Sequence, residues 1–129
     1  MKLIVAGSRS IVRYAVVSTA IHAACKKWED PTVDEIVSGM ARGVDTLAVR
    51  YANINGIPVK AMPADWKGDG RSAGYKRNVR MAEYADALVA IWDGVSVGTK
   101  HMVDTARARG LLVAVYLVED KEHDNALLC

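Results

Sequence analysis

Short apolar runs alternate with stretches of helical spacing along most of this chain. The apolar runs have the length of strands and cover residues 2–6, 35–38, 57–62, 86–92 and 111–118. The intervening stretches place apolar side chains three or four positions apart, as amphipathic helices do, at residues 11–27, 46–55, 75–84 and 100–109. This alternation predicts an α/β fold with a mostly parallel five-stranded sheet and helices on both of its faces.

Local signals refine several of these elements. Ser10 suits the N-cap of the first helix. In the second helix the apolar residues Leu47, Tyr51 and Ile54 share one side. Pro58, near the start of the third apolar run, indicates an edge strand, because proline cannot donate a ladder hydrogen bond.

Residues 86–110 combine a strand, a loop of small residues and a helix. Thr99 is predicted to cap this helix and Gly110 to end it in a left-handed turn. The first N–H groups of a helix have no partner inside the helix, and its dipole adds partial positive charge there. Gly94, Ser96, Gly98 and Thr99 are therefore predicted to hold an anion such as phosphate, although a tight turn explains the same residues.

Residues 63–74 are predicted to form the longest irregular segment, because they are polar and contain three glycines around Trp66. Trp66 could stack on a nucleic-acid base, since an aromatic face accepts any base. It could instead anchor this loop on the body of the protein. The second interpretation is preferred.

Composition excludes several classes of protein. The 129 residues fit one domain, and the net charge of +2 is too small to indicate nucleic-acid binding by itself. Cys25 and Cys129 do not form a disulfide framework, and Cys25 is predicted to be a buried thiol, which suits a cytoplasmic protein. No signal peptide or membrane span is predicted. Neither a metal site nor a cofactor is expected, because the three histidines and the cysteines lack ligand spacing.

Three glycine-containing loops follow predicted strands. They begin at Gly7, Gly39 and Gly94. Because parallel strands end at one edge of their sheet, these loops should meet there, where open α/β sheets bind their ligands. A ligand site at this edge explains three such loops better than turns alone.

The loop motifs resemble those of a known family. They are Gly7-Ser8-Arg9, Ser38-Gly39-Met40-Ala41-Arg42-Gly43-Val44-Asp45, Ala64-Asp65-Trp66, Arg77-Asn78 and Asp93-Gly94-Val95-Ser96-Val97-Gly98-Thr99. In this order they resemble the YspA/YpsA-related branch of the SLOG superfamily. The resemblance covers residues 1–118 and implies a single nucleotide-binding domain with a Rossmann-like three-layer fold. Residues 119–129 are then a charged C-terminal tail.

The resemblance implies two further activities as alternatives. LOG proteins are phosphoribohydrolases, and Gly98-Thr99 and Arg77 match their pattern, but Met102 stands where their glutamate is expected. DprA proteins bind single-stranded DNA, and residues 38–45 with Arg77-Asn78 match their motifs. The chain is too short for the additional domains of DprA.

The motif residues are the candidate site. The ligand-binding candidates are Gly7, Ser8, Arg9, Gly39, Ala41, Arg42, Gly43, Asp45, Asp65, Trp66, Arg77, Asn78, Asp93, Gly94, Ser96, Gly98 and Thr99. Arg9 could bind phosphate as a fork, and Asp45 could accept from ribose hydroxyls or satisfy helix amides. If the protein is an enzyme, Arg77 and either Asp45 or Glu83 are the catalytic candidates.

The sequence therefore favours a sensor or sequestering protein that binds a nucleotide or nucleotide derivative. A hydrolase acting on an N-glycosidic or phosphate bond is the first alternative, and a single-strand nucleic-acid binder is the second. Lys67, Arg71, Lys76, Arg77 and Arg80 form a basic cluster that suits a polyanion or a solvated face. No membrane partner is expected, whereas a homo-oligomer is, because SLOG proteins frequently dimerise.

Overall fold

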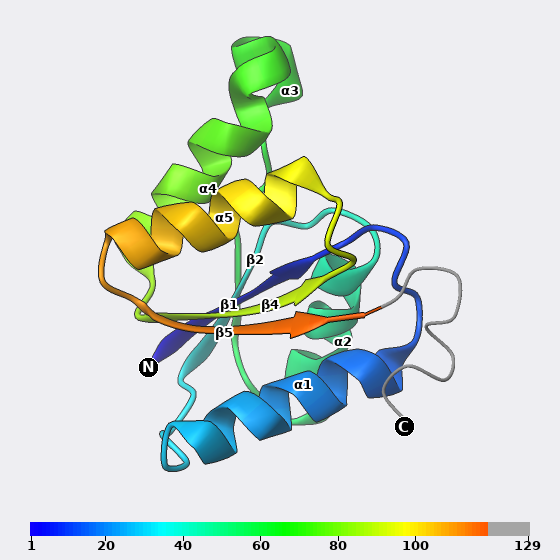
Figure 1. The fold of residues 1–129 in the computed structure, drawn as a ribbon, viewed down its shortest axis with the longest axis vertical. Coiled ribbons are helices and arrows are strands. Elements are labelled where there is room, and N and C mark those ends of the chain that lie inside the picture. Colours follow the sequence, from blue (N-terminus) through cyan, green and yellow to red (C-terminus); the bar gives the residue numbers. More distant parts are fainter. Residues whose placement is uncertain (119–129) are drawn as a thin grey trace.

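A computed structural model describes residues 1–118 and contains a five-stranded sheet in which every pairing is parallel (Figure 1). The strands, in the spatial order β3-β2-β1-β4-β5, are β3 (Val59–Ala61), β2 (Glu35–Ser38), β1 (Lys2–Gly7), β4 (Ala87–Trp92) and β5 (Leu112–Leu117). The predicted fold class is confirmed, and the strand at Pro58 does lie at an edge. This is a Rossmann-like three-layer α/β arrangement.

Helices cover both faces of the sheet (Figure 1). One face carries α1 (Tyr14–Lys27) and α2 (Val44–Ile54), and the other carries α4 (Ala73–Tyr84) and α5 (Val97–Ala108). Two short turns of helix, α3 (Trp66–Asp69) and η1 (Gly70–Ser72), lead into α4.

Successive residues of each central strand enter different hydrophobic cores. In β1, Leu3 and Val5 pack with α1 and α2, whereas Ile4 and Ala6 pack with α4 and α5. This alternation follows from the two-residue period of a strand. Because both faces are buried, the strand reads as a continuous apolar run, as expected for a parallel sheet.

The order of the strands places a switch point between β1 and β4. From β1 the chain moves to β2 and β3 on one side, and then returns to β4 and β5 on the other. At this junction a Cβ on Gly7 would lie only 2.1 Å from the Ile91 carbonyl oxygen, so only glycine permits the observed approach. The crevice beyond the carboxyl ends of β1 and β4 is where such a sheet forms a ligand site.

Two predicted helix caps are wrong. The N-cap of α1 is Arg13, not Ser10, because the Ile11 N–H bonds to the Ser8 carbonyl and buried Ile11 holds the preceding loop against the core. The N-cap of α5 is Ser96, and Thr99 lies inside the first turn of the helix. Gly110 does follow the end of α5 with φ of 77°, as predicted.

The prediction of an irregular segment at residues 63–74 is also wrong. The Asp65 carboxylate accepts from the Gly68 N–H at 2.9 Å and thereby begins α3 despite the nearby glycines. The Ser72 hydroxyl then donates to the Asp69 carbonyl at 2.9 Å within the turn that joins α4. Trp66 is 55% exposed, and its ring lies against Gly74 of α4 rather than in the core.

Two side chains that the sequence suggested would be buried are exposed or only partly buried. Tyr51 of α2 is buried, but Ile54 is 62% exposed, because Ala48 and Ala52 supply the inner face of the helix instead. Cys25 is only partly buried, so the buried thiol is not confirmed.

Within the described part of the chain, no helix has both the length and the apolar character that crossing a membrane requires. The tail at 119–129 lies outside the described residues.

The approach of two loops at Gly43 should be essential for stability. Gly43 has φ of 80°, and a Cβ there would lie 2.6 Å from Arg9 Cα and 2.7 Å from the Ser8 carbonyl oxygen. Gly43→Ala is therefore expected to lower the free energy of unfolding by more than about 2 kcal/mol, as measured by urea denaturation.

Gly56→Ala is the matched control. Gly56 also has a positive φ, 67°, but a Cβ there meets no atom within 4 Å. Gly56→Ala should lower the free energy of unfolding only by the penalty for a left-handed backbone at a non-glycine residue, about 1 kcal/mol. Equal losses for the two variants would show that the contact with the Ser8–Arg9 backbone contributes nothing.

Candidate functional site

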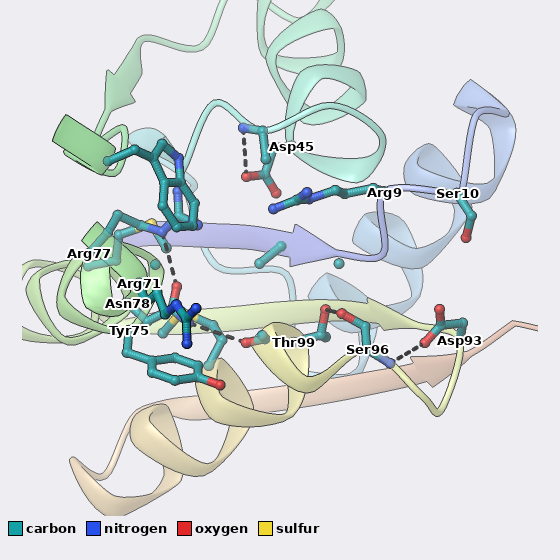
Figure 2. Close-up of a pocket in the computed structure, with 18 residues that line it drawn as sticks. Arg9, Ser10, Asp45, Arg71, Tyr75, Arg77, Asn78, Asp93, Ser96 and Thr99 are labelled. Atoms are coloured by element: carbon teal, nitrogen blue, oxygen red, sulfur yellow. Dashed lines mark hydrogen bonds between the residues drawn. The ribbon is translucent and has the colours of Figure 1, made fainter. Parts of the chain in front are cut away.

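A pocket of about 490 Å³ lies beyond the carboxyl ends of β1 and β4, at the switch point of the sheet (Figure 2). Its size is typical of a small-molecule or cofactor site. The residues that line it are Ala6, Gly7, Arg9, Ser10, Ala41, Asp45, Trp66, Arg71, Gly74, Tyr75, Arg77, Asn78, Met81, Asp93, Ser96, Gly98, Thr99 and Met102. They come from the end of β1, from the loops after β1, β2 and β4, and from α2, α3, η1, α4 and α5.

The loop after β1 supplies one wall. Ser8 is buried, and its hydroxyl accepts from the Asp93 N–H at 3.0 Å, which ties this loop to the loop after β4. Arg9 is exposed and extends from this wall toward Asp45 (Figure 2). The first loop therefore combines a rigid base with a charged side chain that reaches the pocket.

Asp45 at the start of α2 is a buried carboxylate on the pocket wall. Only 5% of it is exposed, and Oδ2 accepts from the Ala41 N–H at 3.1 Å. Burial raises the pKa of Asp45 to about 6, although the Ala41 hydrogen bond and the charges of Arg77 and Arg9 oppose this shift. The carboxylate is therefore poised to gain or lose a proton near neutral pH.

Arg77 of α4 is fixed against the loop after β2. Its Nη1 donates to the Gly39 carbonyl at 2.7 Å, and its Nε donates to Asn78 Oδ1 at 3.1 Å. A Cβ on Gly39 would lie 2.2 Å from Arg77 Nη1 and 2.9 Å from Asp45 Oδ2, so glycine is needed for both side chains to fit. Burial lowers the pKa of Arg77 while Asp45 raises it, and the guanidinium stays charged.

Asn78 links α4 to α5. Its Nδ2 donates to the Gly98 carbonyl at 3.2 Å and lies 3.1 Å from His101 Nδ1. Because Nδ2 can only donate, His101 Nδ1 acts as the acceptor, which requires a neutral imidazole. Burial lowers the pKa of His101 and so favours that neutral form. The Tyr75 ring packs on His101 at 4.4 Å between centroids and also lines the pocket.

Asp93 organises the loop after β4. Its Oδ1 accepts from the Val95 N–H at 2.8 Å and from the Ser96 N–H at 2.7 Å, the second of which is drawn in Figure 2. Burial alone would raise the pKa of Asp93, but these hydrogen bonds and one from Ser8 lower it below its usual value. The Ser96 amide, which was predicted to bind a ligand, is therefore occupied by this carboxylate, as is the neighbouring Val95 amide. Helix geometry leaves the N–H groups of residues 97–99, in the first turn of α5, without partners inside the helix.

Comparison with known proteins identifies the family of the chain. A family model described as "YspA, cpYpsA-related SLOG family" matches residues 1–68 of the 129. The chain belongs to this SLOG family. The match contains the loops after β1 and β2, whereas Arg77, Asn78 and the loop after β4 lie beyond it.

Two individual relatives extend this result. Gene 61 protein of Mycobacterium phage D29 is 38% identical, over 60% of this chain and 67% of that protein. The X-ray structure of DNA processing protein A (DprA) from Streptococcus pneumoniae is similar over 88% of this chain, with a TM-score of 0.69 and 20% sequence identity. The SLOG chain spans 49% of that DprA chain. At this identity the similarity establishes the fold alone.

The structure brings together most of the SLOG-motif residues that the sequence nominates. Those that line the pocket are Gly7, Arg9, Ala41, Asp45, Trp66, Arg77, Asn78, Asp93, Ser96, Gly98 and Thr99. Those that do not line it are Ser8, Gly39, Arg42, Gly43, Asp65 and Gly94. Arg42 faces an adjacent hollow, and Asp65 caps α3. Glu83, the alternative base, lies 3.4 Å from Arg109 and is not part of the pocket lining.

Several lining residues of the SLOG pocket were not among the sequence candidates. They are Ala6, Ser10, Arg71, Gly74, Tyr75, Met81 and Met102. Gly74 and Met81 lie four and three positions from Asn78 within α4, so helical spacing could have identified them once Asn78 was placed on the pocket face. Met102 brings no carboxylate to the position where LOG proteins are expected to have one. Among the described residues, no group of three potential ligands could hold a metal ion.

The raised pKa of Asp45 predicts how stability depends on pH. Between pH 4 and 6 the folded protein keeps a proton on Asp45 that the unfolded chain has lost, so this group lowers stability as pH rises. At pH 7.5 the full cost is present, up to about 3 kcal/mol for a shift of about two pKa units. Asp45→Asn should therefore unfold at higher urea concentration than the parent at pH 7.5.

The control for this prediction is the same pair of proteins at pH 3.5. There Asp45 is protonated in the folded state and largely protonated in the unfolded state, so the two proteins should differ little. If Asp45→Asn were equally destabilising at both pH values, the carboxylate would instead contribute net stability through its contacts.

Proposed function

We propose that the pocket binds a nucleotide or a nucleotide-derived anion, and that the protein acts as a sensor or sequestering protein for it. One observation carries this proposal. A single pocket of about 490 Å³ contains three arginines, a buried carboxylate, aromatic side chains and the first turn of a long helix. The arginines and the helix turn suit a phosphate, the carboxylate suits the ribose hydroxyls, and the aromatic side chains suit the base.

The phosphate would lie between the N-terminus of α5 and the arginines. Among the described residues, no hydrogen bond or ion pair engages the guanidinium of Arg9 or Arg71, so both are available to an anion. The first-turn amides of α5 add donors and the positive end of the helix dipole. Charge-assisted bonds of this kind contribute about 1.5–3 kcal/mol each.

Asp45, Trp66 and Tyr75 would bind the nucleoside. The Asp45 carboxylate uses Oδ2 for the Ala41 N–H, and its other oxygen can accept from ribose hydroxyls. Trp66 and Tyr75 are 55% and 44% exposed at the pocket, and each offers a surface on which a base can stack.

The comparisons support a role connected with nucleotides or nucleic acids in general terms. Membership of the SLOG family and a fold similar to a protein named for DNA processing both agree with it. Neither supports one ligand over another, so the proposal depends on the chemistry of the pocket.

Hydrolysis of an N-glycosidic bond is a second candidate function. The observation in its favour is Asp45, whose pKa near 6 suits a general base and which lies beside Arg77 and Gly39. Asp45 would take a proton from a water molecule that attacks the anomeric carbon. The base would leave with the bonding electron pair, while Arg77 stabilises the nearby phosphate.

Binding can be tested without knowing the natural ligand. Nucleoside monophosphates and diphosphates, NAD and ADP-ribose are screened by thermal shift, since a ligand that binds the folded state raises its melting temperature. For any compound that binds, Arg9→Gln and Arg71→Gln should each weaken affinity at least about tenfold, the loss of one charge-assisted bond.

Arg107→Gln is the matched control, because Arg107 is an exposed arginine in the last turn of the same helix α5, at the end away from the pocket. It should leave affinity unchanged. Loss of affinity in all three variants would indicate attraction by overall charge rather than a pocket.

The hydrolase candidate is tested on the same compounds. Each compound that raises the melting temperature is incubated with the protein, and the free base and ribose phosphate are measured by chromatography. Product should form with the parent protein and fall at least about a hundredfold with Asp45→Asn, the usual contribution of a general base. If the bound compounds remain intact, hydrolysis of those compounds is excluded, and the proposal that the pocket binds them still stands.

A further inference from the structure

A second hollow adjoins the main pocket. It is an open hollow on the surface, of about 430 Å³, and is lined by Arg9, Ala41, Arg42 and Trp66. Three of these residues, Arg9, Ala41 and Trp66, also line the main pocket. The two spaces therefore adjoin along these three residues.

The lining of the second hollow carries two positive charges that no ion pair among the described residues neutralises. Among residues 1–118, no ion pair or hydrogen bond engages the side chain of Arg42, and the same holds for Arg9. The four residues that line the second hollow include two arginines and no carboxylate. A neutral group gains little from such a surface, whereas a phosphate gains two charge-assisted contacts.

Trp66 stands beside these arginines with 55% of its surface exposed. It belongs to the four-residue helix α3, whose N-cap, Asp65, fixes the turn through the Gly68 N–H. An aromatic side chain held at the boundary of two cavities can stack with a ring in either one.

We infer that the ligand is a phosphate-linked dinucleotide rather than a mononucleotide. This inference rests on the proposed nucleotide-binding function. One nucleotide occupies the main pocket, Arg9 and Arg42 hold the linking phosphate, and the second nucleoside occupies the adjoining hollow against Trp66. A free dinucleotide and the end of a single-stranded nucleic acid share this chemistry.

The test compares matched ligands by isothermal titration calorimetry. The probes are the four 5′-mononucleotides, the corresponding 5′-phosphorylated homodinucleotides, NAD, and ten-nucleotide homopolymers. At least one dinucleotide should bind about tenfold or more tightly than its mononucleotide, the gain from one charge-assisted phosphate contact. The parent, Arg42→Gln and Arg107→Gln proteins are measured in parallel.

Arg42→Gln should reduce the ratio of dinucleotide affinity to mononucleotide affinity by about tenfold, and Arg107→Gln should leave that ratio unchanged. Because Arg42 is exposed and unpaired among the described residues, the Arg42→Gln protein without ligand should have the same melting temperature as the parent. Equal affinities for mononucleotide and dinucleotide would overturn the inference and leave the proposed function standing. Binding by none of the probes would overturn both.

The ten-nucleotide probe distinguishes the two sources of the ligand. Affinity equal to that of the dinucleotide supports a free dinucleotide as ligand. Affinity that rises with length and falls steeply with salt supports the end of a nucleic-acid strand, because each further phosphate contact releases counterions.

Discussion

Two backbone segments from different loops touch at Gly43, and the candidate site depends on that contact. The residue has a positive φ and leaves no room for a Cβ against Ser8 and Arg9. Gly7 allows an equally close approach between the ends of β1 and β4. Because the loops meet backbone to backbone, the side chains beside them, Arg9 and Asp45, are directed into one common space rather than into separate surface regions.

The second constraint is that the fold removes the charged side chains of Asp45 and Arg77 from water, which does not stabilise the folded state. Burial raises the pKa of Asp45 and lowers that of Arg77, so each side chain is less stable in its charged form than it would be in water. Within residues 1–118, no ion pair of 4 Å or less joins the two. A buried carboxylate near a partly buried guanidinium, with no ion pair between them, costs stability, and such groups commonly mark functional sites.

Sequence patterns predicted the sheet well, because a fully buried parallel strand is a continuous apolar run and its length is visible directly. They predicted the helix starts less well. Thr99 and Ser10 are good capping residues, but α5 starts after the local turn that Asp93 makes with the Ser96 N–H, and buried Ile11 holds the loop before α1 against the core. The glycines near Trp66 suggested a loop, whereas a single Asp65 cap was enough to begin a helix there.

The site was predictable in part for the same reason. Parallel strands bring their following loops to one edge, so the order of elements along the chain was enough to group Gly7, Asp45 and Thr99. The left-handed backbone of Met40, with φ of 62°, could not be foreseen, since only the surrounding structure imposes it on a methionine. The role of Asp93 was hidden too. The Asp93 carboxylate occupies two loop amides, so an incoming anion must bind to the first turn of α5 and to the arginines. In the main pocket Asp45 and Asp93 partly offset the arginines, whereas the hollow beside Arg42 has two arginines and no carboxylate.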